Sequence, residues 1–340
     1  MIQKSFFQSF IKRQPLIGIL VIMASFNFLI INNLFAQQRK GLQHDLFSVS
    51  FPNGKDGWVC GRWGTILHTA DSGSTWLRQQ SGTKYTLSSI CFVDSLKGWA
   101  VGDGGTILHT NNGGQNWVKQ KGPVSYFLMG VHFANAQKGW IVTERTNILY
   151  TEDGGKSWGI QFKDDDFILK SVSFCDERNG WAVGEYGYIY HTDDGGKSWK
   201  RQAGEFGFSE KTGEIVAGNL LFDVIAVHPS TAWVVGIDGY VAKTLDGGKT
   251  WMKVTNGIPK GHLFGVTNKR GSLAIGGNTI LLNSSDGGKS FGVTKAEPPI
   301  TYGWIYRIVP RGEVGFAAIG KRGWIYLSDK EGVFWHRIVY

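Results

Sequence analysis

The chain has 340 residues, of which 42% are hydrophobic and 19% are charged, so it can bury a large core. Its three cysteines, Cys60, Cys91 and Cys175, are odd in number and occupy unrelated places, which excludes a disulfide framework and a cysteine metal site. The formal net charge of +9, part of which lies in the first 13 residues, is too mild to argue for nucleic-acid binding.

The N-terminal 36 residues differ from the rest of the chain. Three basic residues precede an uncharged apolar run over 16–31, and Ala36 offers a small residue for cleavage. The segment 1–36 is therefore predicted to be a secretory signal peptide, or a membrane anchor if it stays attached. In either case residues 37–340 are predicted to be exported, to a periplasm or lumen or to the outer face of a membrane.

A short motif recurs down almost the whole chain: an Asp or Asn, then Gly-Gly-Lys or a near copy, then an aromatic residue. The acidic or amide positions are Asp71, Asn112, Asp153, Asp194, Asp246, Asp286 and Asp329, and the aromatic positions are Trp76, Trp117, Trp158, Trp199, Trp251, Phe291 and Trp335. Successive aromatic positions lie 40–44 residues apart, except for one interval of 52. A period of about 40–45 residues is that of a four-stranded propeller blade. The chain is therefore predicted to be an all-β, seven-bladed β-propeller, with blades at about 44–81, 85–122, 126–163, 167–203, 219–256, 261–295 and 302–340.

Blade two shows the plan of one repeat. Strands are expected at 88–93, 98–102, 106–110 and 116–119, with a Gly-Gly turn between the second and third strands. In propellers the first strand lines the central channel and the fourth lies outside. The turns between second and third strands, and the connections between blades, should therefore open on the same end of the ring.

The repeated acidic residue is interpreted as part of the architecture. A short carboxylate at the start of a turn accepts backbone N–H bonds two or three residues on, and the aromatic residue beyond it packs against the blade. A calcium site or a catalytic centre would need several copies to converge, whereas turns on successive blades radiate apart. The same reasoning applies to His68, His109 and His191, which share one place in the third strand. No metal site and no cofactor is predicted.

The repeated motif is similar to the Asp box of sialidases, xyloglucan-degrading glycosidases and sortilin-type receptors. Two copies also carry the pattern Gly-Trp-Ala-Val-Gly-x-x-Gly-x-Ile upstream of the box, at 98–107 and 180–189. This combination resembles the photosystem II stability/assembly factor family of seven-bladed propellers, over roughly residues 44–340. The resemblance implies a lumenal or periplasmic, non-catalytic protein that binds a protein partner, a membrane protein or complex subunit, and assists assembly of the complex. The protein itself is expected to be a monomer.

Two other functions stay open at this stage. A secreted Asp-box glycosidase or glycan-binding propeller would need paired carboxylates about 5–9.5 Å apart, and no Asp or Glu stands out for that role. The segment 306–310 only faintly resembles the Arg-Ile-Pro signature of sialidases, and it lies in the last blade. An extracytoplasmic scaffold subunit of an unrelated complex is the third possibility. The chain is predicted not to be an enzyme.

Residues that break the repeat are the candidates for function. Eleven of the fourteen tryptophans fill two repeat positions, and the others are Trp63, Trp304 and Trp324. Basic residues stand in the same turns, where other blades are acidic; they are Arg62, Lys321 and Arg322. Because blades one and seven become neighbours when the ring closes, these six residues are predicted to gather at the closure seam and to bind a partner. The alternative is that Trp63 and Trp324 only seal the seam.

Two further departures are counted as partner-binding candidates. Counting back from the second strand places Arg307 in a column that is apolar in the other blades, although a one-residue shift in the register of blade seven would make this unremarkable. The connection over 204–218 is longer than its equivalents, and its Phe206 and Phe208 are expected either to contact a partner or to pack over the blade. The acidic run at 164–166 is interpreted as a solvated surface.

Overall fold

The computed structural model describes residues 42–209 and 211–340, so the segment predicted as a signal or anchor lies outside the described residues. The part from His44 to Ile338 forms one compact unit, and all the strands lie in it. No helix among the described residues is both long and apolar enough to cross a membrane.

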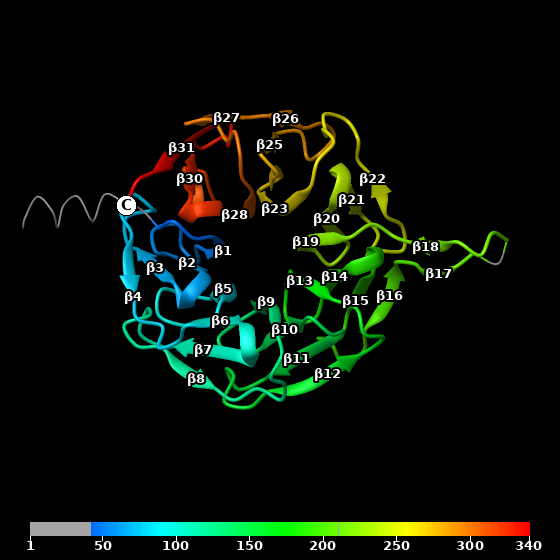
Figure 1. The fold of residues 1–340 in the computed structure, drawn as a ribbon, viewed down its shortest axis with the longest axis horizontal. Coiled ribbons are helices and arrows are strands. Elements are labelled where there is room, and N and C mark those ends of the chain that lie inside the picture. Colours follow the sequence, from blue (N-terminus) through cyan, green and yellow to red (C-terminus); the bar gives the residue numbers. More distant parts are fainter. Residues whose placement is uncertain (1–41, 210) are drawn as a thin grey trace, which may run out of the picture. The chain divides into compact units, whose positions relative to one another are not determined.

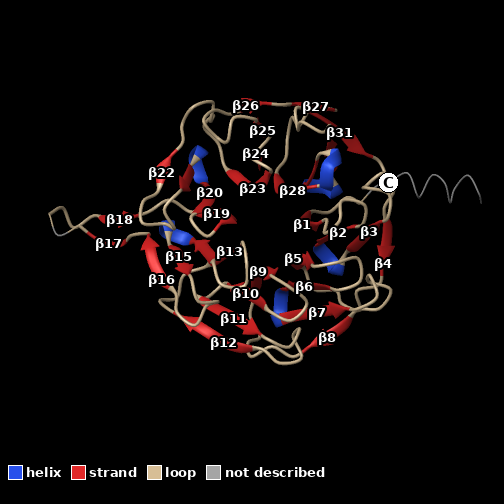
Figure 2. Cartoon of the chain, turned by 180° about the vertical axis from the view of Figure 1, so that it is seen from behind, coloured by secondary structure: helices blue, strands red, loops and turns tan. Residues whose placement is uncertain are grey.

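This unit is a seven-bladed β-propeller, which confirms the predicted fold (Figure 1). Each blade is an antiparallel sheet whose four strands follow one another from the channel to the rim (Figures 1 and 2). Blades one to four consist of β1 (Leu46–Ser50), β2 (Gly57–Gly61), β3 (Ile66–Thr69) and β4 (Leu77–Gln79); β5 (Leu87–Phe92), β6 (Gly98–Gly102), β7 (Thr106–Thr110) and β8 (Val118–Gln120); β9 (Leu128–Phe133), β10 (Gly139–Thr143), β11 (Asn147–Thr151) and β12 (Gly159–Lys163); and β13 (Leu169–Phe174), β14 (Gly180–Gly184), β15 (Ile189–Thr192) and β16 (Lys200–Ala203). Blades five to seven consist of β19 (Leu221–His228), β20 (Thr231–Gly236), β21 (Val241–Thr244) and β22 (Met252–Lys253); β23 (Leu263–Lys269), β24 (Ser272–Gly277), β25 (Leu281–Ser284) and β26 (Gly292–Val293); and β28 (Ile305–Pro310), β29 (Phe316–Gly320), β30 (Ile325–Ser328) and β31 (Phe334–Ile338).

Three strands lie outside this plan, and short 3₁₀ turns join many of the strands. The strands β17 (Phe206–Phe208) and β18 (Ile215–Ala217) form a hairpin between blades four and five, and β27 (Lys295–Glu297) pairs in parallel with the outer strand of blade seven. The turns between second and third strands are η1 (Arg62–Gly64), η2 (Asp103–Gly105), η3 (Glu185–Gly187), η4 (Ile237–Gly239) and η6 (Lys321–Gly323), while η5 (Gly312–Val314) precedes β29.

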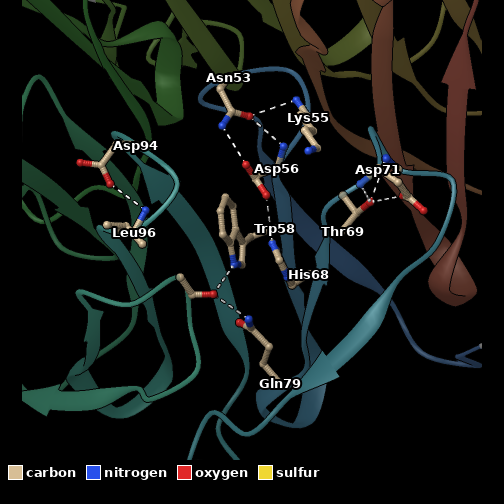
Figure 3. Close-up of polar contacts among 12 residues, drawn as sticks. Asn53, Lys55, Asp56, Trp58, His68, Thr69, Asp71, Gln79, Asp94 and Leu96 are labelled. Atoms are coloured by element: carbon tan, nitrogen blue, oxygen red, sulfur yellow. Dashed lines mark hydrogen bonds and ion pairs between the residues drawn. The ribbon is translucent and has the colours of Figure 1, made fainter.

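The tryptophan of the second strand joins each of the first three blades to the next one. The Trp99 ring stacks on Phe133 of blade three, with ring centroids 3.6 Å apart, and its Nε1 donates to the carbonyl oxygen of Gly154 at 3.1 Å. Trp58 and Trp140 repeat both contacts in blades one and three. Figure 3 shows the blade-one copy, with Gln79 donating to the same carbonyl as Trp58. Buried indoles therefore supply both the packing and a directional hydrogen bond between blades.

In blades six and seven a cation replaces this indole. Ala274 and Ala317 hold the tryptophan position there, as the strand registers show. Lys269 Nζ donates to the carbonyl oxygen of Lys330 at 2.9 Å, and Arg311 Nη1 donates to that of Ser72. These carbonyls belong to the second residue of an Asp box, the same place at which the indoles of blades one to three donate. The loss of the tryptophan is thus compensated at one other position of the repeat.

The Asp-box turns are held together by their own side chains. In blade one, the Asp71 carboxylate accepts bonds from the Thr75 N–H at 2.9 Å and the Thr75 hydroxyl at 2.6 Å. It also accepts the Thr69 hydroxyl at 2.7 Å (Figure 3). These donors, the Thr75 hydroxyl first, lower the pKa of Asp71 to about 2. Trp76 then packs behind the turn and donates its Nε1 to the carbonyl of Gly73 at 2.9 Å.

Candidate functional site

A β-bulge in the inner strand of every blade creates the mouth of the central channel. In each blade the register between the first and second strands shifts by one residue, and the extra residue pairs with nothing. Bulges change the direction of side chains, and one bulged residue per blade stands at this mouth: Phe47, Ser88, Met129, Lys170, Phe222, Phe264 and Tyr306. Sequence analysis missed this set of seven residues. Its signal was present, because each of the seven residues follows a buried Leu or Ile at the start of the strand.

Four of these residues form a continuous aromatic arc over blades one, seven, six and five. The ring centroids of Phe47 and Tyr306 lie 5.2 Å apart, those of Tyr306 and Phe264 5.8 Å, and those of Phe264 and Phe222 4.8 Å. Trp304 extends the arc outward, 6.3 Å from Phe264. The repeat does not require these rings, since blade two has Ser88 at the same place.

The arc is one side of a cavity of about 490 Å³ with cationic groups at its edge. Arg62 and Lys170 both line it, and burial lowers the pKa of Lys170 while the nearby Glu185 opposes that shift. The rest of the lining is Phe47, Thr86, Ser88, Phe127, Met129, Phe222, Phe264 and Tyr306. A concave, mostly apolar site with a few positive groups can hold an apolar or aromatic side chain together with an anionic group.

Deeper in the channel, Arg307 forms an ion pair with Asp223 of blade five. Asp223 is buried, and its carboxylate also accepts bonds from the Ser171 hydroxyl at 2.6 Å and the Val266 N–H at 3.0 Å. Blade six lies between the two partners and places Gly265 there, where a Cβ would come within 3.2 Å of the Arg307 backbone. A small residue in blade six is therefore what lets the ion pair form.

The placement of Arg307 in the apolar column of the inner strands was wrong, and the alternative of a one-residue register shift holds. Ala317, and not Phe316, holds the place of the second-strand tryptophan in blade seven. Ile308, which pairs with Ala318, therefore occupies the apolar column, while Arg307 corresponds to Ser48 and Asp223. In blade six, Val266 pairs with Ile275 and occupies this column, and Phe264 is the bulged residue two places before it. Arg307 is thus a channel residue paired with a carboxylate, and its binding role stays a prediction.

Asp45 organises the closure seam on the channel-mouth end. Its carboxylate accepts the backbone N–H of Arg322 at 3.0 Å and the hydroxyl of Tyr306 at 3.3 Å, and it lies 3.7 Å from Arg62 Nε. The Arg62 guanidinium also lies over the Phe47 ring, 5.6 Å from its centroid. The structure thus brings Arg62 and the Arg322 turn together through one carboxylate that sequence analysis did not single out.

The three tryptophans that fall outside the repeat positions lie in three different surroundings near this seam. Lys321 Nζ lies over the Trp304 ring at 5.0 Å, so this pair adjoins the aromatic arc. Trp324 is half-buried and lies under Arg337. Trp63 is 66% exposed and has a left-handed backbone with φ of 59°; its side chain lines a cavity on the blade-two side of η1.

The sequence matches the family described as Photosynthesis system II assembly factor YCF48 over residues 31–123, 118–205 and 209–340. The chain belongs to this family. The predicted resemblance is therefore confirmed. No curated protein matches the chain in sequence.

Solved structures of YCF48 have the same fold as this family member. The structure described as YCF48 bound to D1 peptide is 19% identical, with a TM-score of 0.68, and the match covers 85% of this chain and 95% of that one. YCF48 from Cyanidioschyzon merolae is 18% identical, with a TM-score of 0.66 and coverage of 84% and 95%. The GH74 enzyme of Niastella koreensis is 13% identical, with a TM-score of 0.69, and the match covers 87% of this chain but 54% of the enzyme. At these identities the likeness shows the fold alone.

The insertion between blades four and five is a hairpin in this YCF48-family propeller. Phe206 packs on Tyr186 and Phe167 of blade four, with ring centroids 4.4 and 5.4 Å apart, while Phe208 is 73% exposed. The base of the hairpin lies beside η3, where the Glu205 N–H donates to the Tyr186 carbonyl at 3.0 Å, and Figure 1 shows the hairpin extending outward from the ring beyond β16 and β22. The two phenylalanines thus have different surroundings: one packs on the blade and the other is open to solvent.

The described residues contain no cluster of His, Cys, Asp and Glu suited to a metal ion. The histidines of the third strand instead stack on the tryptophans of the second, as His109 does on Trp99 with centroids 4.7 Å apart.

In the acidic run at 164–166, the Asp164 carboxylate accepts the hydroxyl of Tyr190 at 2.9 Å.

Proposed function

We propose that this YCF48-family chain is an exported, non-catalytic assembly factor that binds a protein segment at the mouth of its central channel. The observation that carries the proposal is the aromatic arc of Phe47, Tyr306, Phe264 and Phe222, which lies beside exposed cations and has no role in the blade repeat. A related propeller is described as bound to a D1 peptide, which supports a polypeptide ligand and a photosystem II subunit as its source.

The chemistry of the mouth suits a polypeptide segment that has both apolar or aromatic side chains and acidic groups. Aromatic rings and guanidinium groups dominate the energetics of protein interfaces, because each buries a large area and the guanidinium also makes directional hydrogen bonds. Arg62, Lys321 and Arg322 stand at the edge of the arc and would meet acidic groups of the partner. A monomer would suffice for this site, since the surfaces used belong to one chain.

Glycoside cleavage is the competing function, and the lining of the mouth argues against it. A retaining or inverting glycosidase needs two carboxyl groups about 5–9.5 Å apart around the bond that is cleaved. The residues that line the cavity of about 490 Å³ include no Asp and no Glu. Asp223 lies deeper and is already held by Arg307, Ser171 and Val266.

Capture from solubilised membranes tests the proposal. Tagged protein would be incubated with detergent extracts of the source membranes, and bound proteins would be identified by mass spectrometry. The variant Arg62→Gln/Lys321→Gln/Arg322→Gln should lose the partner. Neutral replacements are preferable to Glu, because Arg62 lies 3.7 Å from Asp45 and a second carboxylate there would disturb the seam itself.

A matched control removes the same charge from the exposed Asp-box lysines, as Lys156→Gln/Lys197→Gln/Lys249→Gln. This control should bind the partner like the unmodified protein. Equal capture by both triple variants would exclude the seam as the binding surface. Turnover of a glycoside by the purified protein at an enzyme-like rate would overturn the non-catalytic assignment.

A further inference from the structure

A second cavity, of about 700 Å³, lies between blades one and two and shares only Thr86 with the lining of the cavity at the channel mouth. Trp63 and Tyr85 stand at its edge and are 66% and 52% exposed, and Leu108 and Trp117 lie deeper. The remaining lining is polar: Ser81, Gly82, Thr83, Lys84, Thr86, Asp103, Thr106 and Lys119. This volume lies within the range of about 300–1,000 Å³ typical of ligand sites.

The repeat itself explains why the space is empty. At the place where the third strand begins, blades four, five, six and seven have the large residues Tyr188, Tyr240, Ile280 and Trp324. In three of them a cation of the fourth strand lies over the ring: Arg201 over Tyr188 at 5.2 Å, Lys253 over Tyr240 at 5.8 Å and Arg337 over Trp324 at 5.6 Å. Blade two has the small Thr106 at this place.

The cation that belongs over such a ring is still present in blade two. Lys119 pairs with Leu108 in the register in which Arg201 pairs with Tyr190 and Lys253 with Ala242, so it is the equivalent residue. It lines the cavity together with Thr106.

Two other blades also have a small residue here, but a neighbour engages it. The Thr65 hydroxyl bonds to His44 at 2.8 Å, and Asn147 donates to the hydroxyl of Tyr126. The Thr106 hydroxyl, in contrast, is buried and makes no hydrogen bond. Of the seven places, all of which are described, blade two alone has neither a large side chain nor a bonded neighbour.

We propose that this cavity binds an aromatic side chain of a partner polypeptide, which takes the place that Tyr188 and Tyr240 fill in their own blades. The inserted ring would lie under Lys119 and against Leu108, with the exposed Trp63 and Tyr85 beside it. Because these two rings line an open side of the cavity, the chain on either side of the inserted residue can run over them. The inference goes beyond the proposed function, since it concerns a different site and does not depend on a photosystem subunit.

Titration followed by NMR tests this inference with defined probes. N-acetyl-tyrosinamide should bind with a Kd of about a millimolar and shift the indole N–H signal of Trp63, whereas N-acetyl-leucinamide should bind at least about tenfold more weakly. The pentapeptide Ala-Ala-Tyr-Ala-Ala should bind more tightly than p-cresol. Equal binding of the tyrosine and leucine probes would overturn the aromatic site, and equal binding of the peptide and p-cresol would overturn a polypeptide ligand.

Variants taken from the repeat make the test specific. Thr106→Tyr copies blades four and five, so it should fill the cavity and weaken the tyrosine probe by more than about tenfold while the protein stays folded. Lys119→Gln should weaken it about two- to fivefold through loss of the cation–π contact. Tyr240→Thr, which opens the same place in blade five, should create a second site for the probe. Unchanged binding by Thr106→Tyr, or no new site in Tyr240→Thr, would overturn the proposal.

Discussion

Arg307 and Asp223 form an ion pair along the wall of the central channel, from the inner strands of blades seven and five. Asp223 is 1% exposed and Arg307 is 29% exposed. The two residues are far apart in the sequence and skip the blade between them, where Gly265 leaves the space. This pair ties four blades together, because the same carboxylate also accepts bonds from Ser171 in blade four and from the backbone of Val266 in blade six.

Removing the cation of this pair should be costly. Arg307→Met would leave the buried Asp223 carboxylate without a counter-charge, so the free energy of unfolding should fall by about 3–5 kcal/mol. Urea denaturation of both proteins measures the difference. Arg270→Met provides the control, because Arg270 and Glu313 are both exposed and 2.9 Å apart, and loss of that pair should cost less than about 1 kcal/mol. Equal losses in the two variants would contradict the prediction.

The seam between blades seven and one should depend on Arg311. Arg311→Val removes the donors to the carbonyls of Ser72 and Ser328. Since the first acceptor is partly buried and the second is buried, the unfolding free energy should fall by about 2–4 kcal/mol. The double variant Arg311→Val/Ala317→Trp gives blade seven the second-strand tryptophan that blade one has, and this tryptophan would pack against Phe51. It should therefore recover at least half of the lost stability, as a double-mutant cycle would show. Additive losses would mean that the cation does not stand in for the indole.

The repeat could be read from the sequence because each blade is a local unit with its own turns. The aromatic positions and the Gly-Gly turns recur at nearly constant spacing, so the seven sheets and their order were predictable. The seam cations and Trp304 were also singled out, because they break that pattern.

The channel mouth could not be read in the same way. Blade seven has no tryptophan in its second strand, so counting from Phe316 in place of Ala317 misplaced Arg307 by one residue. The aromatic arc and the partnership of Arg307 with Asp223 exist only when the ring closes, and no spacing along the chain encodes them. The cavity beside Thr106 likewise appears only when blades are compared in space.

Acid should weaken the fold through the Asp boxes. The hydrogen bonds of each turn lower the pKa of Asp71 and Asp153 to about 2, from an ordinary value of 3.8. The folded protein therefore keeps these carboxylates ionised while the unfolded chain takes up protons, so stability is full above about pH 4 and falls as the pH drops toward 2. Urea denaturation between pH 2 and pH 5 should show this loss. Asp71→Asn should have a smaller pH-dependent part, and an unchanged profile in that variant would contradict the assignment.

Removal of the Trp63 side chain tests whether this tryptophan seals the seam between blades one and seven. Its φ of 59° is a left-handed conformation that costs a residue with a Cβ about 1–2 kcal/mol, and the equivalent residue in blade two is Gly104, with φ of 62°. Because the indole is exposed and makes no hydrogen bond or ring contact within residues 42–209 and 211–340, Trp63→Gly should leave the unfolding free energy unchanged or raise it by up to about 1 kcal/mol. A tryptophan that sealed the ring would instead cost about 3–5 kcal/mol when removed. Thermal and urea denaturation of Trp63→Gly decide between these outcomes, and Trp335→Gly, at a buried indole, shows what loss of a packed tryptophan looks like in the same fold.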